Sequence, residues 1–179
     1  PQVKFGIISE KQNLGGINLN KVLLSTGKDD WETPQKFFSE LDKEFEFTLD
    51  PCSTDSNAKC KNHFSEKDNG LIQDWGTHTV FCNPPYSKSG KQDLWVEKCY
   101  QASLNGATVV ALLPARTDTH RFHKYILNKA EIRFIEGRLF FEINGKPILD
   151  KHGKPQPAPF PSMVCIWKPK HKTRKRLEE

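Results

Sequence analysis

The 179-residue sequence has no C-x-x-C pair, no G-x-G-x-x-G string and no apolar run approaching the length of about eighteen residues needed to span a bilayer. Because its five cysteines form an odd set without a close pair, we expect neither a disulfide framework nor a zinc ribbon. The missing glycine string disfavours an enzyme that uses a nicotinamide cofactor. The lack of a long apolar run and of a secretory signal pattern predicts a soluble, intracellular protein with no membrane partner.

Metal ligands are scarce as well. Cys52, Cys60 and His63 are close in sequence, but a fourth ligand of a metal site is missing. Cys82 and Cys165 fall in apolar runs, where cysteine behaves as a small hydrophobic residue. We therefore expect no metal site.

The net charge of +5 is unevenly distributed along the chain. Residues 1–80 carry 9 Lys and Arg against 13 Asp and Glu, whereas residues 81–167 carry 12 against 7 and residues 168–179 carry 6 against 2. A basic second half favours contact with a phosphate backbone, so it indicates a nucleic acid as partner. The basic end of the chain is equally compatible with a solvated terminus.

Four residues, Asn83, Pro84, Pro85 and Tyr86, follow the apolar run 79–82. Each proline lacks an N–H and has a fixed φ, so the pair ends a strand and makes the turn rigid. The side-chain oxygen of Asn83 and the carbonyl of Pro84 can then act as two acceptors for one NH2 group, and Tyr86 offers a flat face for a ring. The alternative is a strand-ending turn without chemistry.

This arrangement of acceptors favours methylation of an amine on an aromatic ring. Such an amine is a poor nucleophile because its lone pair is conjugated with the ring. Two acceptors that hold both of its hydrogens can pull the nitrogen toward tetrahedral geometry and free the lone pair. Since the amide of Asn83 is too weakly basic to remove a proton first, we expect methyl transfer to precede proton loss.

The tetrapeptide resembles the catalytic motif of amino-methyltransferases that use S-adenosylmethionine. Other segments resemble, in the same order, the small phage-type DNA adenine methyltransferases. These segments are DWETP at 30–34, LDPC at 49–52, NAKC at 57–60, QDW at 73–75 and LPART at 113–117. The resemblance covers roughly residues 28–168.

The resemblance implies transfer of a methyl group from S-adenosylmethionine to the exocyclic amine of adenine in DNA. It implies that the base is flipped from double-stranded DNA onto Tyr86, in the cytoplasm of a bacterial host. No obligate protein partner is evident. Two alternatives stay open. A methyltransferase acting on RNA or on a protein glutamine would keep the same turn, and a non-catalytic nucleic-acid-binding relic would keep only the fold and the basic residues.

The resemblance also implies that Trp31, Thr33 and Pro34 touch the methionine end of the cofactor. The same residues predict the start of a helix, with Thr33 as N-cap and Pro34 at the first helical position. The alternative is therefore a helix start in which Trp31 only packs against the core.

The remaining cofactor candidates follow expected strands or lie in turns. Asp50 and Ser53 are candidates for the cofactor's ammonium and carboxylate, because ligands bind outside the carboxyl ends of strands in open α/β sheets. Asn57 is expected to open a short helix beside them. Asp74 can accept from the adenine amine of the cofactor while Trp75 stacks on its ring. The alternatives are plain turns at Asp50 and Asp74 and a core position for Trp75.

Candidate DNA contacts lie in three polar loops. One is the basic loop around residues 87–92, one follows the strand 107–113, and one is the proline-rich loop 150–161. The candidates are Lys88, Lys91, Arg116, Thr117, Lys151 and Lys154. The alternative for Arg116 is an exposed loop residue paired with Asp118.

The order of the elements predicts an α/β Rossmann-like methyltransferase fold, with a single mixed sheet flanked by helices. The fold is expected to be shortened between the first strand and the catalytic turn. We predict a weakly ordered extension at 1–27, a methyltransferase domain at 28–168 and a basic tail at 169–179. Helices are expected at 34–45, 94–104 and 119–128, and strands at 45–49, 79–82, 107–113, 131–135, 139–143, 146–149 and 162–167.

Overall fold

The computed structural model describes residues 31–86 and 91–169. The predicted extension at 1–27 lies outside the described residues, as do Lys88 and all but the first residue of the predicted tail. Within the described part of the chain, no helix is long and apolar enough to cross a membrane.

The main sheet has four strands in the order β1-β2-β6-β3. β1 (Thr79–Cys82) pairs with β2 (Thr108–Pro114) in parallel, and β6 (Ser162–Trp167) runs antiparallel to both β2 and β3 (Glu131–Phe134). The predicted strands at 79–82, 107–113, 131–135 and 162–167 are thus confirmed to within one residue. They are mostly short apolar runs of β-branched and aromatic residues, which suit a buried sheet.

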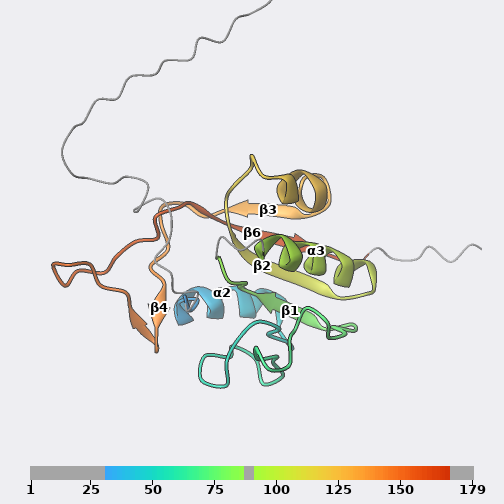
Figure 1. The fold of residues 1–179 in the computed structure, drawn as a ribbon, viewed down its shortest axis with the longest axis horizontal. Helices are drawn as coiled ribbons and strands as arrows, with labels where there is room; N and C mark the ends of the chain where they lie inside the picture. Colours follow the sequence, from blue (N-terminus) through green and yellow to red (C-terminus); the bar gives the residue numbers. More distant parts are fainter. Residues whose placement is uncertain (1–30, 87–90, 170–179) are drawn as a thin grey trace, which may run out of the picture.

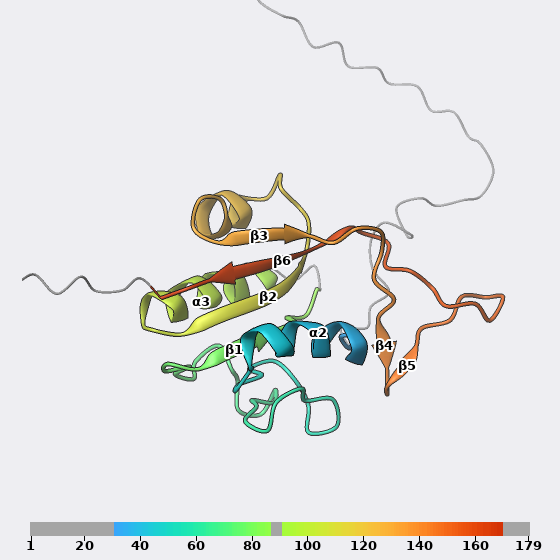
Figure 2. The same cartoon turned by 180° about the vertical axis from the view of Figure 1, so that it is seen from behind.

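Helices cover both faces of this sheet. In Figure 1 α3 (Lys91–Leu104) lies in front of β2, whereas in Figure 2 the sheet lies in front of α3 and α2 (Gln35–Phe45) is nearer the viewer. Side chains of β2 alternate between the faces, with Val109 and Leu113 in the α3 cluster and Val110 in the α2 cluster. The mixed, helix-flanked α/β sheet expected from the sequence is therefore present.

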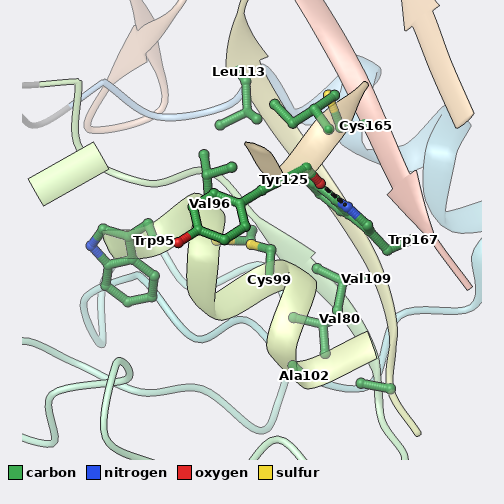
Figure 3. Close-up of a cluster of buried hydrophobic side chains, with 14 of the residues drawn as sticks. Val80, Trp95, Val96, Cys99, Ala102, Val109, Leu113, Tyr125, Cys165 and Trp167 are labelled. Carbon is green, nitrogen blue, oxygen red and sulfur yellow. Dashed lines mark hydrogen bonds between the residues drawn. The ribbon is translucent and has the colours of Figure 1, made fainter. Parts of the chain in front are cut away.

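The face of α3 that packs on the sheet agrees only in part with the face expected from the sequence. Trp95, Val96 and Cys99 are buried (Figure 3), whereas Leu94 and Leu104 are 53% and 44% exposed. Residues 95, 99 and 102 follow one another by three or four positions and so line one stripe of the helix. The apolar pattern predicts a face formed by Leu94, Val96, Cys99, Tyr100 and Leu104. Val96 and Cys99 are confirmed on the buried face and Tyr100 packs partly buried against it, whereas the two leucines were wrong.

The first predicted strand, at 45–49, is also not formed as a strand. Phe45 still belongs to α2, and Glu46 ends that helix with a left-handed φ of 53°. Only Leu49 and its neighbour Asp50 make isolated parallel bridges, to Val80 and His63. The helix therefore uses residues that the alternating pattern had assigned to the strand. Its predicted N-cap was wrong by one residue, because α2 begins after Pro34 and has no side-chain cap.

Residues 51–78 contain turns, bends and an isolated bridge but no helix or strand. Asn57 lies in a turn, where its Oδ1 accepts from the N–H of Thr54 at 2.7 Å, so the helix predicted there was wrong. Close packing holds the segment together: a Cβ added to Gly70 would lie 2.1 Å from the carbonyl oxygen of Pro51. Only glycine allows the backbone to approach that closely.

The second half of the chain adds a π-helix and a hairpin. The predicted helix at 119–128 is largely the π-helix η1 (Phe122–Ile126), in which the N–H of Leu127 donates to the carbonyl of Phe122, five residues back. β4 (Glu142–Ile143) and β5 (Lys146–Pro147) form a separate two-stranded sheet, so the expected single sheet was wrong in this detail.

The predicted two-residue turn of this hairpin is confirmed. Asn144 and Gly145 have φ values of 52° and 68°, as a tight hairpin turn requires. Both strands are shorter than predicted. The loop that follows the hairpin projects away from the main sheet in both views (Figures 1 and 2).

Candidate active site

The catalytic candidates lie at one edge of the main sheet. β1 and β2 are parallel, so Asn83 and Ala115 follow them at the same edge. β6 is antiparallel and begins there, and the N–H of Ala115 donates to the carbonyl of Pro161 at 2.8 Å. The carboxyl ends of the two parallel strands and the segment before β6 therefore enclose the same region.

Both ends of the Asn83 amide are held by hydrogen bonds. Its Nδ2 donates to the carbonyl of Trp31 at 2.9 Å, and its Oδ1 accepts from the hydroxyl of Tyr86 at 2.5 Å. That hydroxyl also lies 3.0 Å from the carbonyl oxygen of Leu112, at the end of β2. The contacts bring together the predicted catalytic turn and Trp31, which is 52 positions away in the sequence.

Four rings form an aromatic cluster around Tyr86, namely Trp31, Tyr86, Phe141 and Phe160. The ring of Tyr86 stands edge-on to Phe160 at 5.4 Å and to Phe141 at 5.9 Å between centroids. Trp31 stacks on Phe160 at 5.5 Å with an interplanar angle of 20°. Phe141 and Phe160 were missed by the sequence analysis, because no periodic pattern connects either residue to the catalytic turn.

Tyr86 is only partly exposed within this cluster. Burial raises the pKa of its hydroxyl well above the usual value, because the phenolate would be poorly solvated. The residue therefore stays neutral near physiological pH and keeps its hydroxyl as a hydrogen-bond donor.

The two predicted cofactor hydroxyls share an unusual feature. The side-chain oxygens of Thr33 and Ser53 are buried and make no hydrogen bond among the described residues. Their segments are neighbours, since Nζ of Lys59 donates to the Gln35 side chain at 3.0 Å. A buried hydroxyl without a partner is costly, so each is available to a polar ligand.

Asp50 is almost fully buried, and its carboxylate organises the loop that follows it. Oδ1 accepts from the N–H of Cys52 at 3.2 Å and Oδ2 from the N–H of Lys59 at 3.0 Å. Burial raises the pKa of Asp50, while these two hydrogen bonds act in the opposite direction. The carboxylate thus has the turn-forming role that the sequence analysis named as its alternative.

The pair Asp74 and Trp75 lies away from the aromatic cluster. Oδ1 of Asp74 accepts from the N–H of Gly76 at 2.9 Å, as in a simple turn. Trp75 is only 1% exposed, its Nε1 donates to the carbonyl of Gly70, and its ring stacks on Trp95 at 6.3 Å. Stacking on a cofactor would require its ring to be uncovered.

The candidate DNA contacts are solvent-exposed where they are described. Arg116 and Thr117 follow β2 at the active-site edge, and Arg116 makes no ion pair with Asp118 among the described residues. Lys151 and Lys154 lie on the projecting loop, in a turn that Asp150 closes by accepting from the N–H of Lys154. Lys88 is outside the described residues, and the side chain of Lys91 is not described.

The part of the chain that the structure describes contains no group of three His, Cys, Asp or Glu side chains that could hold a metal ion. Cys52 and Cys60 are partly buried, and the ring of His63 lies 3.0 Å from Oδ1 of Asp55.

Comparison with known proteins extends the sequence resemblance. A family model described as DNA N-6-adenine-methyltransferase (Dam) matches residues 21–178. A DNA N-6-adenine-methyltransferase of Escherichia phage T1 is 32% identical over 120 residues, which cover 66% of this chain and 49% of that protein. A DNA N-6-adenine-methyltransferase of Haemophilus phage HP1 (strain HP1c1) is 31% identical over 147 residues, or 80% of each chain.

The chain spans about half the length of the T1 relative and four fifths of the HP1 relative. The family match extends over most of the chain and includes the predicted catalytic turn, the segment around Trp31 and the residues of the aromatic cluster. The chain therefore belongs to the DNA N-6-adenine-methyltransferase (Dam) family.

Proposed function

We propose that this protein transfers a methyl group from S-adenosylmethionine to the exocyclic amine of adenine in DNA, using the turn formed by Asn83, Pro84, Pro85 and Tyr86. The observation that carries the proposal is the position of this turn. It lies at the carboxyl end of β1, where hydrogen bonds from Asn83 and Tyr86 join it to Trp31 and to the end of β2. Family membership supports DNA as the substrate.

In this mechanism Oδ1 of Asn83 and the carbonyl of Pro84 accept the two hydrogens of the adenine amine. The hydrogen bond from Nδ2 of Asn83 to Trp31 fixes which end of the amide faces the substrate. Oδ1 accepts from the Tyr86 hydroxyl with one of its two lone pairs, which leaves the second for the amine. The two acceptors then localise the lone pair on the amine nitrogen, and the amine loses a proton only after it has been methylated.

The aromatic cluster supports a flipped base as the reacting form. A base inside a duplex cannot reach a turn at the edge of a sheet, so it has to leave the helix. In this proposal its ring stacks on Tyr86. The partly exposed rings of Trp31 and Phe160 beside Tyr86 supply the apolar surroundings that replace the neighbouring bases.

The cofactor is expected beside the same turn. S-adenosylmethionine supplies a methyl group bound to a positively charged sulfur. The unpartnered hydroxyls of Thr33 and Ser53 fit the polar amino-acid end of such a molecule, and Trp31 and Pro34 border the same segment. Asp50 and Asn57 shape the loop that carries Ser53. The assignments of Asp74 and Trp75 to the cofactor's adenine stay predictions, as does a Rossmann-like topology shortened between the bridge at Leu49 and β1.

Exposed basic residues at the active-site edge and on the projecting loop supply the contacts with the DNA backbone. Arg116, Lys151 and Lys154 have charged ends in solvent and no ion-pair partner among the described residues. Such contacts position a duplex without reading its sequence. The phage origin of both relatives supports action in the cytoplasm of a bacterial host.

The direct test is to incubate the purified protein with adenine-unmethylated plasmid DNA and S-adenosylmethionine and to measure N6-methyladenine by mass spectrometry of the nucleosides. We expect methylated adenine in DNA and none in an RNA of the same sequence or in added protein. Methylation of RNA or of glutamine alone would replace the proposal with that activity. Failure to bind S-adenosylmethionine at millimolar concentration in calorimetry would favour the non-catalytic relic.

A further inference from the structure

Glu32 lies between two residues assigned to the cofactor, yet its own side chain points to the hairpin. Oε1 accepts from the N–H of Asn144 and Oε2 from the N–H of Gly145, both at 3.0 Å. Its backbone forms an isolated antiparallel bridge with Glu142, with N···O distances of 2.9 and 3.0 Å in the two directions. Four hydrogen bonds thus join this residue to the β4–β5 hairpin.

These four hydrogen bonds explain how so short a hairpin is held in a fixed position. Each of its strands has two residues, and an isolated two-stranded hairpin is at best marginally stable. Figures 1 and 2 show the hairpin standing beside the first turn of α2, away from the main sheet. A carboxylate that accepts two consecutive backbone N–H groups makes stronger hydrogen bonds than neutral acceptors do.

The hairpin lies between two parts of the proposed site. Phe141 directly precedes β4, is 1% exposed and packs on Trp31 at 5.1 Å between ring centroids. The chain that follows β5 forms the projecting loop with Lys151 and then returns to Phe160 in the aromatic cluster. The position of the hairpin therefore determines both the rings around Tyr86 and the base of the basic loop.

We propose that Glu32 is a positioning residue that couples cofactor binding to DNA binding, by clamping the β4–β5 hairpin and its loop onto the segment that carries Trp31 and Thr33. The inference rests on the proposed function. A cofactor that orders residues 31–34 also orders the hairpin through Glu32, so DNA meets a loop that is already in place. By reciprocity, bound DNA strengthens cofactor binding by the same factor.

Glu142 provides a matched control for Glu32. It has the same side chain, lies in the same hairpin and makes no side-chain hydrogen bond among the described residues. If negative charge near DNA were the only effect, Glu32→Gln and Glu142→Gln would both tighten DNA binding. If Glu32 positions the hairpin, its replacement weakens DNA binding and the Glu142 replacement does not.

The experiment measures KM for plasmid DNA, kcat, and DNA affinity with and without S-adenosylhomocysteine for Glu32→Ala, Glu32→Gln, Glu142→Ala and Glu142→Gln. We expect Glu32→Ala to raise KM for DNA about 10-fold, which corresponds to the loss of hydrogen bonds to a charged group. We expect Glu32→Gln, which keeps one acceptor oxygen, to fall between Glu32→Ala and the wild type. The tightening of DNA binding by S-adenosylhomocysteine should shrink toward none in Glu32→Ala and persist in both Glu142 variants.

Hydrogen exchange locates the effect in the hairpin. The amides of Asn144 and Gly145 should exchange faster in both Glu32 variants, while the amides of β2 keep their protection. If Glu32→Ala does not fold, the KM for DNA and the coupling to S-adenosylhomocysteine are compared between Glu32→Gln and Glu142→Gln, and that comparison tests the inference. Equal KM and equal coupling in the Glu32 and Glu142 variants would overturn the inference. A wild-type protein that methylates no adenine would instead overturn the proposed function.

Discussion

Trp31 and Trp75 were both assigned to the cofactor, Trp31 through the family resemblance and Trp75 as a ring that stacks on its adenine beside Asp74. The structure places the two residues in very different surroundings. Trp31 is partly exposed, and its carbonyl and its ring contact Asn83 and the aromatic cluster. Trp75 is 1% exposed, stacks on Trp95 and supports the irregular segment 51–78. The two residues show that a tryptophan beside an acidic residue can lie at a partly exposed surface or in the buried core.

The two regions also differ in what stabilises them. At the active-site edge, polar groups of Asn83 and Tyr86 bond to each other and to the backbone carbonyls of Trp31 and Leu112. In the segment 51–78, Asp50 and the close approach of Gly70 replace regular secondary structure. We therefore expect substitutions in the first region to affect turnover and those in the second to affect folding.

The largest expected effect is that of Asn83→Ala on turnover. In the proposed mechanism the variant removes an acceptor that is used mainly by the reacting amine, so kcat should fall by roughly 100- to 1,000-fold. Cofactor affinity, measured by calorimetry, should change little. Asn105→Ala, at an exposed position after α3, serves as the control. Unchanged turnover in Asn83→Ala would show that the turn at residues 83–86 is not catalytic.

The next largest effect is on the free energy of unfolding, which should fall more when Trp75 is replaced than when Trp31 is replaced. Trp75→Ala empties a fully buried position and should lower the free energy of unfolding by about 3–5 kcal/mol, measured by urea denaturation. Trp31→Ala removes a partly exposed ring and should cost about 2 kcal/mol, with a clear loss of cofactor affinity.

Trp75→Phe tests the remaining cofactor assignment of that residue without emptying the core. The variant keeps a ring next to Trp95 and loses the hydrogen bond to Gly70. An affinity for S-adenosylmethionine that matches that of the wild type in calorimetry would leave Trp75 with a core role alone. A loss of affinity in a variant that melts within a few degrees of the wild type would place Trp75 in the cofactor site.

Substitutions of Tyr86 should have smaller effects on methylation, and two of them distinguish the role of its ring from that of its hydroxyl. Tyr86→Ala should lose stacking worth about 1–3 kcal/mol and raise KM for DNA while cofactor affinity is kept. Tyr86→Phe keeps the ring and leaves Oδ1 of Asn83 without its present donor, so it should stay substantially active. Tyr100→Phe on α3 controls for loss of a hydroxyl. An inactive but folded Tyr86→Phe would show that the hydroxyl has a role in the reaction itself.

The smallest effect concerns the basic residues of the two regions. Replacing Lys151 and Lys154 by alanine should make the plot of log K for DNA against log salt concentration less steep, by an amount that corresponds to the loss of up to about two phosphate contacts. The preferred site should not change. The same double replacement at Lys61 and Lys67, which are exposed in the segment 51–78, should leave the salt dependence unchanged. A changed recognition sequence in the first variant would mean that the loop reads bases.

Local patterns were sufficient where short-range chemistry decides the conformation. The proline pair after β1, the apolar runs of β2 and β6, and the Asn144-Gly145 turn were all identified from neighbouring residues. In each case fixed or restricted backbone angles, or continuous burial, leave few conformations open. The family resemblance was likewise contained in short strings along the chain.

Tertiary structure decided everything that depends on residues far apart in sequence. On α3, packing on the sheet buries Trp95 and leaves Leu94 and Leu104 exposed. Phe141 and Phe160 joined Tyr86 only because β6 runs antiparallel to β2 and returns the chain to the active-site edge. Two side chains of the same kind, Trp31 and Trp75, received different environments for the same reason: burial is a property of the folded chain, and no local string encodes it.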